Sequence, residues 1–491
     1  MCLAIFLVAV DGTILSLATP SIVEDLHPSA PQVLWIGDIY SFVLAGLLVT
    51  MGNLGDRYGR KRLLMIGSVA FGIISVGAAF APSAEALILA RALLGVAGAT
   101  LMPSTLALMR STFTDDKERT FAVGVWSAMG AAGAAAGPLV GGILLEHFWW
   151  GSVFLVNVPI MALVLAIGLP TLRESKDPNP GPLDPISVAL SLVGILAFVY
   201  AVKELATHGL EVSYLISGAI GIGALIWFVL RQRILEHPLI DVRLFGNAPF
   251  TGAVLGMILS VFGLAGSLFF FSQYLQFVKG LTPLQAGLFE LPATLGALVA
   301  SLLAARLMRS FGRGPLTAVG LLAIGLGMAA IALILDNPHF LVFAVPLIMI
   351  GAGDGVALTV ASDTILAVAP RDRAGAASAV SETGYELGTA LGIAILGSIL
   401  TAVYQSRLRL PPGLGAKVTE ATIESPGGAY EAAPGLPETI QRALIEAVHV
   451  AFRDAMSFTT IVGSVIIMIG AGVTWYLLPG KLDTVEEMSA H

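Results

Sequence analysis

The chain has 491 residues, of which 56% are hydrophobic and only 12% are charged. Soluble domains use roughly 25% charged residues, so this composition, with a mean hydropathy of +0.88, places most of the chain in lipid. The formal net charge of −7 decides little, because the position of charge matters more than its sum in a membrane protein. The single cysteine, Cys2, excludes a disulfide framework and a multi-cysteine metal site.

The sequence also carries no signature of a catalytic or nucleotide-binding site. It has neither the GxxxxGK[ST] loop that cradles phosphates nor the HExxH pair that binds zinc. We therefore expect no enzyme activity, no cofactor, no metal, no nucleic-acid partner and no direct use of ATP.

Apolar runs long enough to span a bilayer recur along the whole chain. A helix needs about 20 apolar residues to cross the hydrocarbon core. Such runs lie at residues 1–22, 33–54, 63–81, 86–109, 120–145, 152–171, 186–205, 213–230, 249–277, 284–305, 315–335, 340–368, 375–404 and 456–479. They predict an all-α membrane protein with fourteen transmembrane helices. The 55 glycines favour close packing of these helices, and the first run shows no cleavable signal.

Lys and Arg residues are concentrated in alternate loops. If the N-terminus is inside, the inner segments hold eighteen of the 26 Lys and Arg residues, and the six short outer loops hold only Lys203 and Lys279. Short cytoplasmic loops carry such an excess of positive charge. The sequence thus predicts a multi-pass protein of the bacterial inner membrane with both termini in the cytoplasm.

Two similar loops divide the chain into halves. GNLGDRYGRKR begins at Gly52 and ARLMRSFGRG begins at Ala305, so Tyr-Gly-Arg at 58–60 matches Phe-Gly-Arg at 311–313. The loops lie eight helices apart, which equals a six-helix repeat plus two inserted helices. We expect a six-helix bundle over 1–171, two inserted helices over 186–230, and a second six-helix bundle over 249–479. Parallel six-helix halves are the architecture of major facilitator transporters.

The segment 405–455 is the only sizeable extramembrane piece, and this orientation places it outside. Its second part, PETIQRALIEAVHVAFRDA, has apolar residues at helical spacing after a proline. It predicts an external helical hairpin over the outer mouth, between helices 13 and 14; a flexible spacer is the alternative.

Charged residues inside the predicted spans are few and mostly acidic. Each costs about 2.5–3.5 kcal/mol to insert, so such residues mark ion or substrate paths. They are Asp11, Asp38, Arg91, Glu290, Asp354, Glu382 and Glu386. A carboxylate in a low-dielectric environment is easier to protonate, so it can hold either a proton or a cation.

Asp11 and the pair formed by Glu382 and Glu386 are the best candidates for this exchange. The pair is spaced by four residues and shares one helix face, so repulsion favours a proton on one carboxylate unless a cation neutralises both. A structural hydrogen bond for Asp11, and simple packing for the pair, are the alternatives. Arg91 needs a partner or an aqueous cavity; it could drive deprotonation of a carboxylate or form a structural salt bridge.

Other residues are candidates for substrate contact. Asp38 and Glu290 lie toward the outer ends of their helices and could instead belong to the outer mouth. Asp354 lies in GAGDG, and Asp363 approaches the cytoplasmic boundary. The ninth helix offers aromatic rings, which attract organic cations by roughly 0.5–2 kcal/mol, although such rings are often only lipophilic. From this helix we select Phe269, Gln273 and Tyr274.

Two further segments are candidates for conformational gating. The run GAAGAAAGPLVGG is poor in bulk, and its small residues and proline predict a tight interface or a hinge rather than a binding site. The loop that begins at Gly52 places an aspartate among four cations. It could form a network of ion pairs that breaks when the two halves move relative to each other. Alternatively, its positive charge could simply keep the loop on the cytoplasmic side of the membrane. The gating candidates are Gly52, Asp56, Arg57, Gly59, Arg60, Gly133, Gly137, Pro138 and Gly141.

Together these motifs resemble the fourteen-helix drug:proton antiporters of the major facilitator superfamily, the group of quaternary-ammonium and mycobacterial fluoroquinolone and dye efflux pumps. GNLGDRYGRKR resembles the superfamily loop signature, RALLGVAGA the fourth-helix proton-transfer signature, and GAAGAAAGPLVGG the antiporter signature of helix five. DGTILSLATPSI resembles the first-helix signature, in which the Asp, here Asp11, is implicated in proton coupling. SETGYELG resembles a helix-thirteen segment that implies cation recognition by Glu382 and Glu386. In the second half Arg309 replaces Asp56, so a charge relay there is not symmetrical.

The resemblance implies a monomeric secondary transporter that exports lipophilic cationic drugs and dyes in exchange for protons by alternating access. One alternative is an exporter of an endogenous lipid or secondary metabolite on the same fold, as in antibiotic self-resistance. Another is a sensor or scaffold that transports nothing.

Overall fold

The protein is helical throughout the part of the chain that the structure describes. The computed structural model describes residues 1–178, 184–208, 211–236, 238–337, 339–370 and 373–478. Within these ranges it contains α-helices and one 3-10 helix, and no strand. The predicted all-α fold is therefore confirmed.

The first set of helices, here called the first bundle, runs to residue 171. Its members are α1 (Cys2–Leu26), α2 (Ala30–Tyr58), α3 (Arg60–Ala79), α4 (Ala84–Thr112), α5 (Asp116–His147), α6 (Ser152–Leu155) and α7 (Asn157–Thr171). α2 packs on α4, α1 packs on α5, and α3 packs on both α4 and α7. These helices share one hydrophobic core.

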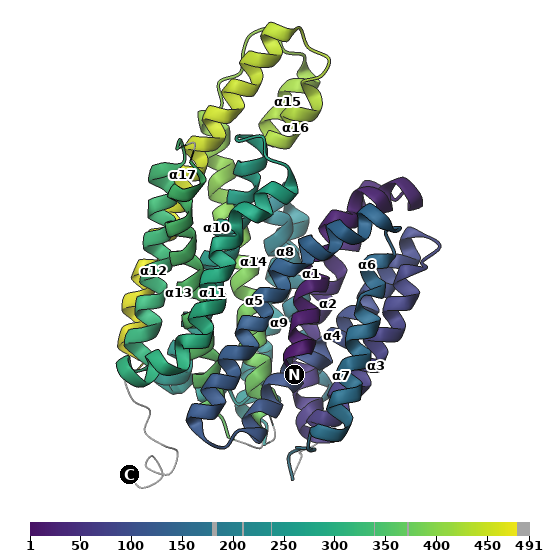
Figure 1. Ribbon diagram of the computed structural model, residues 1–491, viewed down its shortest axis with the longest axis vertical. Coiled ribbons are helices and arrows are strands. Elements are labelled where there is room, and N and C mark those ends of the chain that lie inside the picture. The colour runs from purple at the N-terminus through teal and green to yellow at the C-terminus, as the bar shows by residue number, and fades with distance from the viewer. Residues whose placement is uncertain (179–183, 209–210, 237, 338, 371–372, 479–491) are drawn as a thin grey trace.

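The second bundle repeats this pairing. Its long helices are α10 (Ala248–Phe277), α11 (Pro283–Phe311), α12 (Arg313–Ile334), α13 (Phe340–Val368), α14 (Ala374–Arg407) and α17 (Glu438–Leu477). α11 packs on α13, α10 packs on α14, and α12 packs on both α13 and α17. Figure 1 shows the two bundles side by side, with contacts of α5 to α11 and of α2 to α14 between them.

Two helices stand between the bundles in the chain. α8 (Pro185–His208) packs against both α2 and α14, whereas α9 (Val212–Ile234) packs mainly on α8 and is followed by η1 (Val242–Gly246). Arg231 of α9 donates hydrogen bonds of 2.6 and 3.0 Å to the carboxylate of Asp184. These bonds hold the pKa of Asp184 well below its usual range. They tie the end of α9 to the start of α8.

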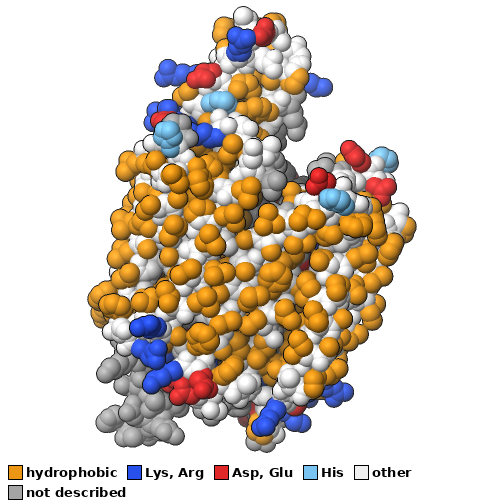
Figure 2. Space-filling model, in the orientation of Figure 1, with side chains coloured by type: hydrophobic (Ala, Val, Ile, Leu, Met, Phe, Trp, Pro, Cys, Tyr) orange, Lys and Arg blue, Asp and Glu red, His pale blue; other side chains and the backbone are white. Residues whose placement is uncertain are grey.

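The number of membrane-spanning helices agrees with the prediction. Among the described residues, thirteen helices are long and apolar enough to span a bilayer, and α1, which bends by 46° between Leu15 and Leu17, makes up to fourteen. The bend was not predicted. Apolar side chains also cover the long sides of the molecule, as expected for a surface that faces lipid (Figure 2).

The segment between α14 and the last span forms a helical hairpin, which differs in two respects from the prediction. α15 (Ala416–Glu424) packs on α16 (Pro426–Ala432), and α16 packs on α17. α17 continues without a break from residue 438 to 477. No proline interrupts that stretch, so the helix has no reason to end at residue 455. The hairpin also rises above the second bundle instead of lying across the mouth (Figure 1). We call this the hairpin end of the molecule, and the opposite end the corner end.

Candidate functional site

The first bundle contains a buried ion pair between α1 and α4. Nη1 of Arg91 lies 2.9 Å from Oδ2 of Asp11, and the two residues are 2% and 1% exposed. Nε of Arg91 also donates to the carbonyl of Ile36 on α2. Asp11 and Arg91, which were predicted separately, therefore neutralise each other in this conformation.

Three further side chains complete this site, and sequence reasoning missed them. Asn157 of α7 donates to Oδ1 of Asp11 at 2.9 Å and to the hydroxyl of Ser75 on α3 at 3.1 Å. The ring of Tyr40 on α2 lies under the Arg91 guanidinium, 4.6 Å from its centroid. Tyr40 is buried, and its hydroxyl has no hydrogen-bond partner. Five helices thus converge on one carboxylate.

The second bundle contains carboxylates without such a cation. Glu382 on α14 is buried, and its Oε1 makes no hydrogen bond. Glu386, one turn further along α14, is half-buried. Asp354 on α13 is also buried and accepts a 2.7 Å hydrogen bond from the hydroxyl of Ser260 on α10. No ion pair joins Glu382, Glu386 or Asp354 to a cation among the residues that the structure describes.

The two charged sites lie on helices that pack against each other. α14, which carries Glu382 and Glu386, packs against α2 and α4, the helices that carry Tyr40 and Arg91. The ring of Tyr40 in turn lies against the guanidinium of Arg91.

The remaining substrate candidates lie in different surroundings. Glu290 is half-buried on α11, and its Oε1 has no hydrogen-bond partner. Asp38 is half-buried on α2 and has an interaction of its own. Tyr274 is buried in the second core, where its hydroxyl donates to the carbonyl of Leu335 at 2.8 Å, while Phe269 is exposed and Gln273 is half-buried. In this conformation Tyr274 is therefore committed to packing, and all five stay candidates only.

The glycine-rich run forms a close contact between α5 and α1. A Cβ added at Gly133 or Gly137 would collide with the carbonyl of Phe6 or the side chain of Thr13, and one at Gly141 would lie 2.8 Å from Ile14. These glycines face α1 at four-residue spacing, which lets the two backbones approach. The side chain of Pro138 lies outside the described residues. The run is thus a tight interface, and its part in gating remains a prediction.

At the corner end, the segment from Gly52, which was predicted as a loop but forms the end of α2 and the start of α3, joins the two bundles. The carboxylate of Asp56 pairs with Arg60 at 2.7 Å and accepts hydrogen bonds from the backbone N–H groups of Gly375 and Ala376 in the first turn of α14. A helix N-terminus favours such a negative charge. Arg60 also donates to Ser175 at 2.7 Å.

Glycines allow this junction to close. Gly59 has φ of 115°, a backbone conformation that a side chain disfavours, and it turns the chain between α2 and α3. A Cβ at Gly52 would lie 2.5 Å from the carbonyl oxygen of Gly375 across the bundle interface. Arg57 stacks on neighbouring Tyr58, 5.5 Å from its ring centroid.

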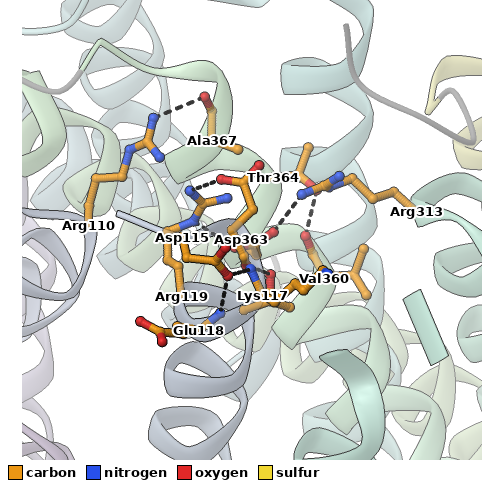
Figure 3. Close-up of polar contacts among 12 residues, drawn as sticks. Arg110, Asp115, Lys117, Glu118, Arg119, Arg313, Val360, Asp363, Thr364 and Ala367 are labelled. Carbon is orange, nitrogen blue, oxygen red and sulfur yellow. Dashed lines mark hydrogen bonds and ion pairs between the residues drawn. The ribbon is translucent and has the colours of Figure 1, made fainter. Parts of the chain in front are cut away.

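A second junction at the corner end was missed by sequence reasoning. Arg119 at the start of α5 donates to Asp363 of α13 at 2.9 Å, and Arg313 at the start of α12 donates to the other oxygen of Asp363 at 2.8 Å (Figure 3). Arg110 of α4 reaches the carbonyl of Ala367 at 3.3 Å in the same region. Arg119 and Asp363 are fully buried, so this link between bundles is shielded from solvent.

The cross-bundle hydrogen bonds of Asp56, Arg110 and Arg119 all lie at the corner end. The structure therefore records a state in which that end is closed. A pair of helix bundles with the same pairing of helices, closed at one end by polar contacts and carrying buried carboxylates within the spans, is the arrangement of a membrane transporter.

Comparison with known proteins identifies the class further. A model of the Major Facilitator Superfamily matches residues 1–393. The chain belongs to that superfamily, and it is a secondary transporter rather than an enzyme.

Individual relatives cover nearly the whole chain. The multidrug efflux pump LfrA of Mycolicibacterium smegmatis is 46% identical over 473 residues, covering 96% of this chain and 94% of that protein. The methyl viologen resistance protein SmvA of Salmonella typhimurium is 37% identical over 479 residues, covering 96% and 95%. Among solved structures, the proton:xylose symporter XylE has a TM-score of 0.62 at 16% identity, covering 100% of this chain and 97% of that one. The similarity to XylE supports only the fold of this chain.

Proposed function

We propose that this protein exports lipophilic cationic drugs and dyes in exchange for protons, by alternating access between its two bundles. The observation that carries the proposal is the buried carboxylate of Glu382, which has an oxygen without a hydrogen-bond partner and forms no ion pair within the part of the chain that the structure describes. A charge in such a place is costly, so the group must hold a proton or a positively charged ligand. Because a proton and a cationic drug replace each other at this carboxylate, transport of the drug is coupled to transport of protons.

The similarity to known exporters supports the cationic substrate class. LfrA is a multidrug efflux pump, and SmvA confers resistance to methyl viologen, an aromatic dication. A cation between the bundles would meet Glu382, Glu386 and Asp354 on one side and the Asp11–Arg91 pair on the other. Asp38, Glu290, Phe269 and Gln273 are proposed as outlying contacts of the path.

The steps of the cycle follow from electrostatics. In the proposed state open at the corner end, a cationic drug enters and displaces protons from the second-bundle carboxylates. After the corner end closes, protons from the hairpin end neutralise the carboxylates and release the drug. Each elementary charge moved across the membrane is driven by about 2.3 kcal/mol per 100 mV, so a divalent drug requires more protons than a monovalent one.

The same proposal includes the orientation in the membrane. The excess of Lys and Arg in the loops at the corner end supports a cytoplasmic location for that end. Both termini then lie on the cytoplasmic side of the bacterial inner membrane. Because one chain supplies both bundles and every carboxylate of the path, we propose that a monomer is the transporting unit.

Dye efflux in inverted membrane vesicles tests the proposal directly. Ethidium accumulation should follow an imposed pH gradient in vesicles that contain the protein, and Glu382→Gln should abolish this dependence. Asp115→Asn is a matched control, because that carboxylate is exposed and only caps α5. Unchanged pH-driven movement in the Glu382 variant would contradict proton coupling through this group, and resistance confined to one compound would favour a dedicated metabolite exporter.

A further inference from the structure

The two helix corners carry opposite charges at matching positions. The chain turns between α2 and α3 at Gly59 and between α11 and α12 at Gly312, both with positive φ. Three residues before each glycine stands Asp56 in the first bundle and Arg309 in the second. Asp56 is buried and accepts a hydrogen bond from the backbone of α14, so the first-bundle corner is in contact with the second bundle. Arg309 is exposed and borders a cavity instead.

This cavity, here called the corner cavity, lies between the α11–α12 corner and the first turn of α5. Its volume is about 470 Å³. Its lining combines cations with polar and apolar side chains, among them Lys117, Arg309, Arg313, Ser310, Met308 and Phe311. Because α5 belongs to the first bundle and the α11–α12 corner to the second, an occupant would touch both.

The lining has an excess of positive charge with unused hydrogen-bond donors. Its one carboxylate, Asp116, is already paired with Arg119 at 2.7 Å. Nη2 of Arg313 is bound to Asp363, but its Nε is buried and has no hydrogen-bond partner. Within the described ranges, the side chains of Lys117 and Arg309 form no hydrogen bond or ion pair, and Lys117 has only a charge interaction with Asp115.

We propose that the corner cavity binds the phosphate group of an anionic phospholipid headgroup. Arginine and lysine donors converging from two directions suit the several oxygens of a phosphate, and basic pockets between membrane helices at the cytoplasmic face bind acidic headgroups. Met308 and Phe311 supply an apolar wall for the glycerol and upper acyl chains. In Figure 2 Lys and Arg side chains near the corner end adjoin both the apolar, lipid-facing surface and a group of acidic side chains, so a headgroup reaches these cations without leaving the bilayer.

Binding at this place has a conformational consequence. A phosphate held by Lys117 on one bundle and by Arg309 on the other joins them at the end that Asp56 and Asp363 also close. The lipid therefore stabilises the state closed at the corner end and favours release of substrate at the hairpin end. This effect on transport rests on the proposed function, whereas the binding does not.

Lipid binding to the purified full-length protein tests the inference. The protein in phosphatidylcholine nanodiscs is titrated with phosphatidylglycerol, and bound lipid is measured by native mass spectrometry. Each of Arg309→Gln and Lys117→Gln should lower the affinity for phosphatidylglycerol about tenfold or more, as expected for the loss of a hydrogen bond between two charged groups. Arg306→Gln removes an equal charge from the same helix outside the cavity lining and should leave the affinity unchanged.

The outcomes separate the possible sources of the anion. Equal losses in Arg306→Gln and Arg309→Gln would overturn the site in favour of general surface attraction. Protection of the protein against heat by inorganic phosphate alone, to the same extent as by phosphatidylglycerol, would overturn the assignment to lipid. Both variants should match the wild type in melting temperature without phosphatidylglycerol, which excludes misfolding. Specific lipid binding without any dye efflux would leave the site intact and refute the proposed function instead.

Discussion

The carboxylates of the two bundles are neutralised in different ways. In the first bundle, Asp11 is buried against Arg91 and held by Asn157, so the protein supplies its own counter-charge. In the second bundle, Glu382 is equally buried, but among the described residues it forms no ion pair and one of its oxygens makes no hydrogen bond. The comparison teaches that burial alone does not define a coupling site. A paired carboxylate contributes to the architecture, whereas an unpaired one must obtain its neutrality from a proton or a ligand.

The largest effect is expected when the paired site is broken. Asp11→Asn leaves the Arg91 charge buried without its partner, and such a change costs about 3–5 kcal/mol. Thermal unfolding of the purified protein should show a clear drop in melting temperature. The double variant Asp11→Asn with Arg91→Gln removes both charges and should recover most of the loss. A single variant as stable as the wild type would mean that the ion pair contributes no structural support.

Neutralising the unpaired site should have the opposite pattern. Glu382→Gln removes a group that is costly to charge, so the melting temperature should be unchanged or higher. Transport driven by a pH gradient should fall more than tenfold, because the exchangeable charge is gone. Parallel unfolding and ethidium-efflux measurements on this variant and Asp11→Asn give the comparison. A destabilised Glu382→Gln with normal coupling would reverse the assignment of roles.

An effect of intermediate size is expected at the corner end, where the backbones of α2 and α14 approach closely. This effect depends on the space between the two helices rather than on charge. Gly52→Ala places a methyl group against the backbone of Gly375 and should shift the protein toward the state open at the corner end. Spin labels on α3 and α12 near the corners should report a longer mean distance. Gly37→Ala on the same helix has no atom within 4 Å of the added carbon, so its distance distribution should match that of the wild type. Identical distributions in both variants would show that this contact does not control closure.

How far the sequence could predict these features depends on the range of the interactions involved. The spans were predictable because each is a local run of apolar residues. Asp11, Arg91 and Glu382 were predictable one by one, because a charge in an apolar run stands out. Their partners were not, since Asn157 lies 146 residues from Asp11 and has no net charge.

At the corner end, too, the sequence did not show which distant residues become partners. Arg119 and Asp363 lie near helix ends, where a charge normally indicates only a membrane boundary, yet the fold brings them together from 244 residues apart. The unbroken α17 was missed for a different reason: a change from polar to apolar composition was interpreted as a helix boundary, although no residue near 455 ends a helix.

The smallest expected effect concerns Tyr40, whose ring lies against the paired site of the first bundle. Its ring lies 4.6 Å from the guanidinium of Arg91, a contact worth about 0.5–2 kcal/mol, whereas its buried hydroxyl has no partner. Tyr40→Leu should therefore lower the melting temperature slightly, and Tyr40→Phe should not, because it keeps the ring and removes an unsatisfied polar group. Unfolding curves of both variants decide the point. If Tyr40→Phe is the less stable of the two, the hydroxyl rather than the ring supports the Asp11–Arg91 pair.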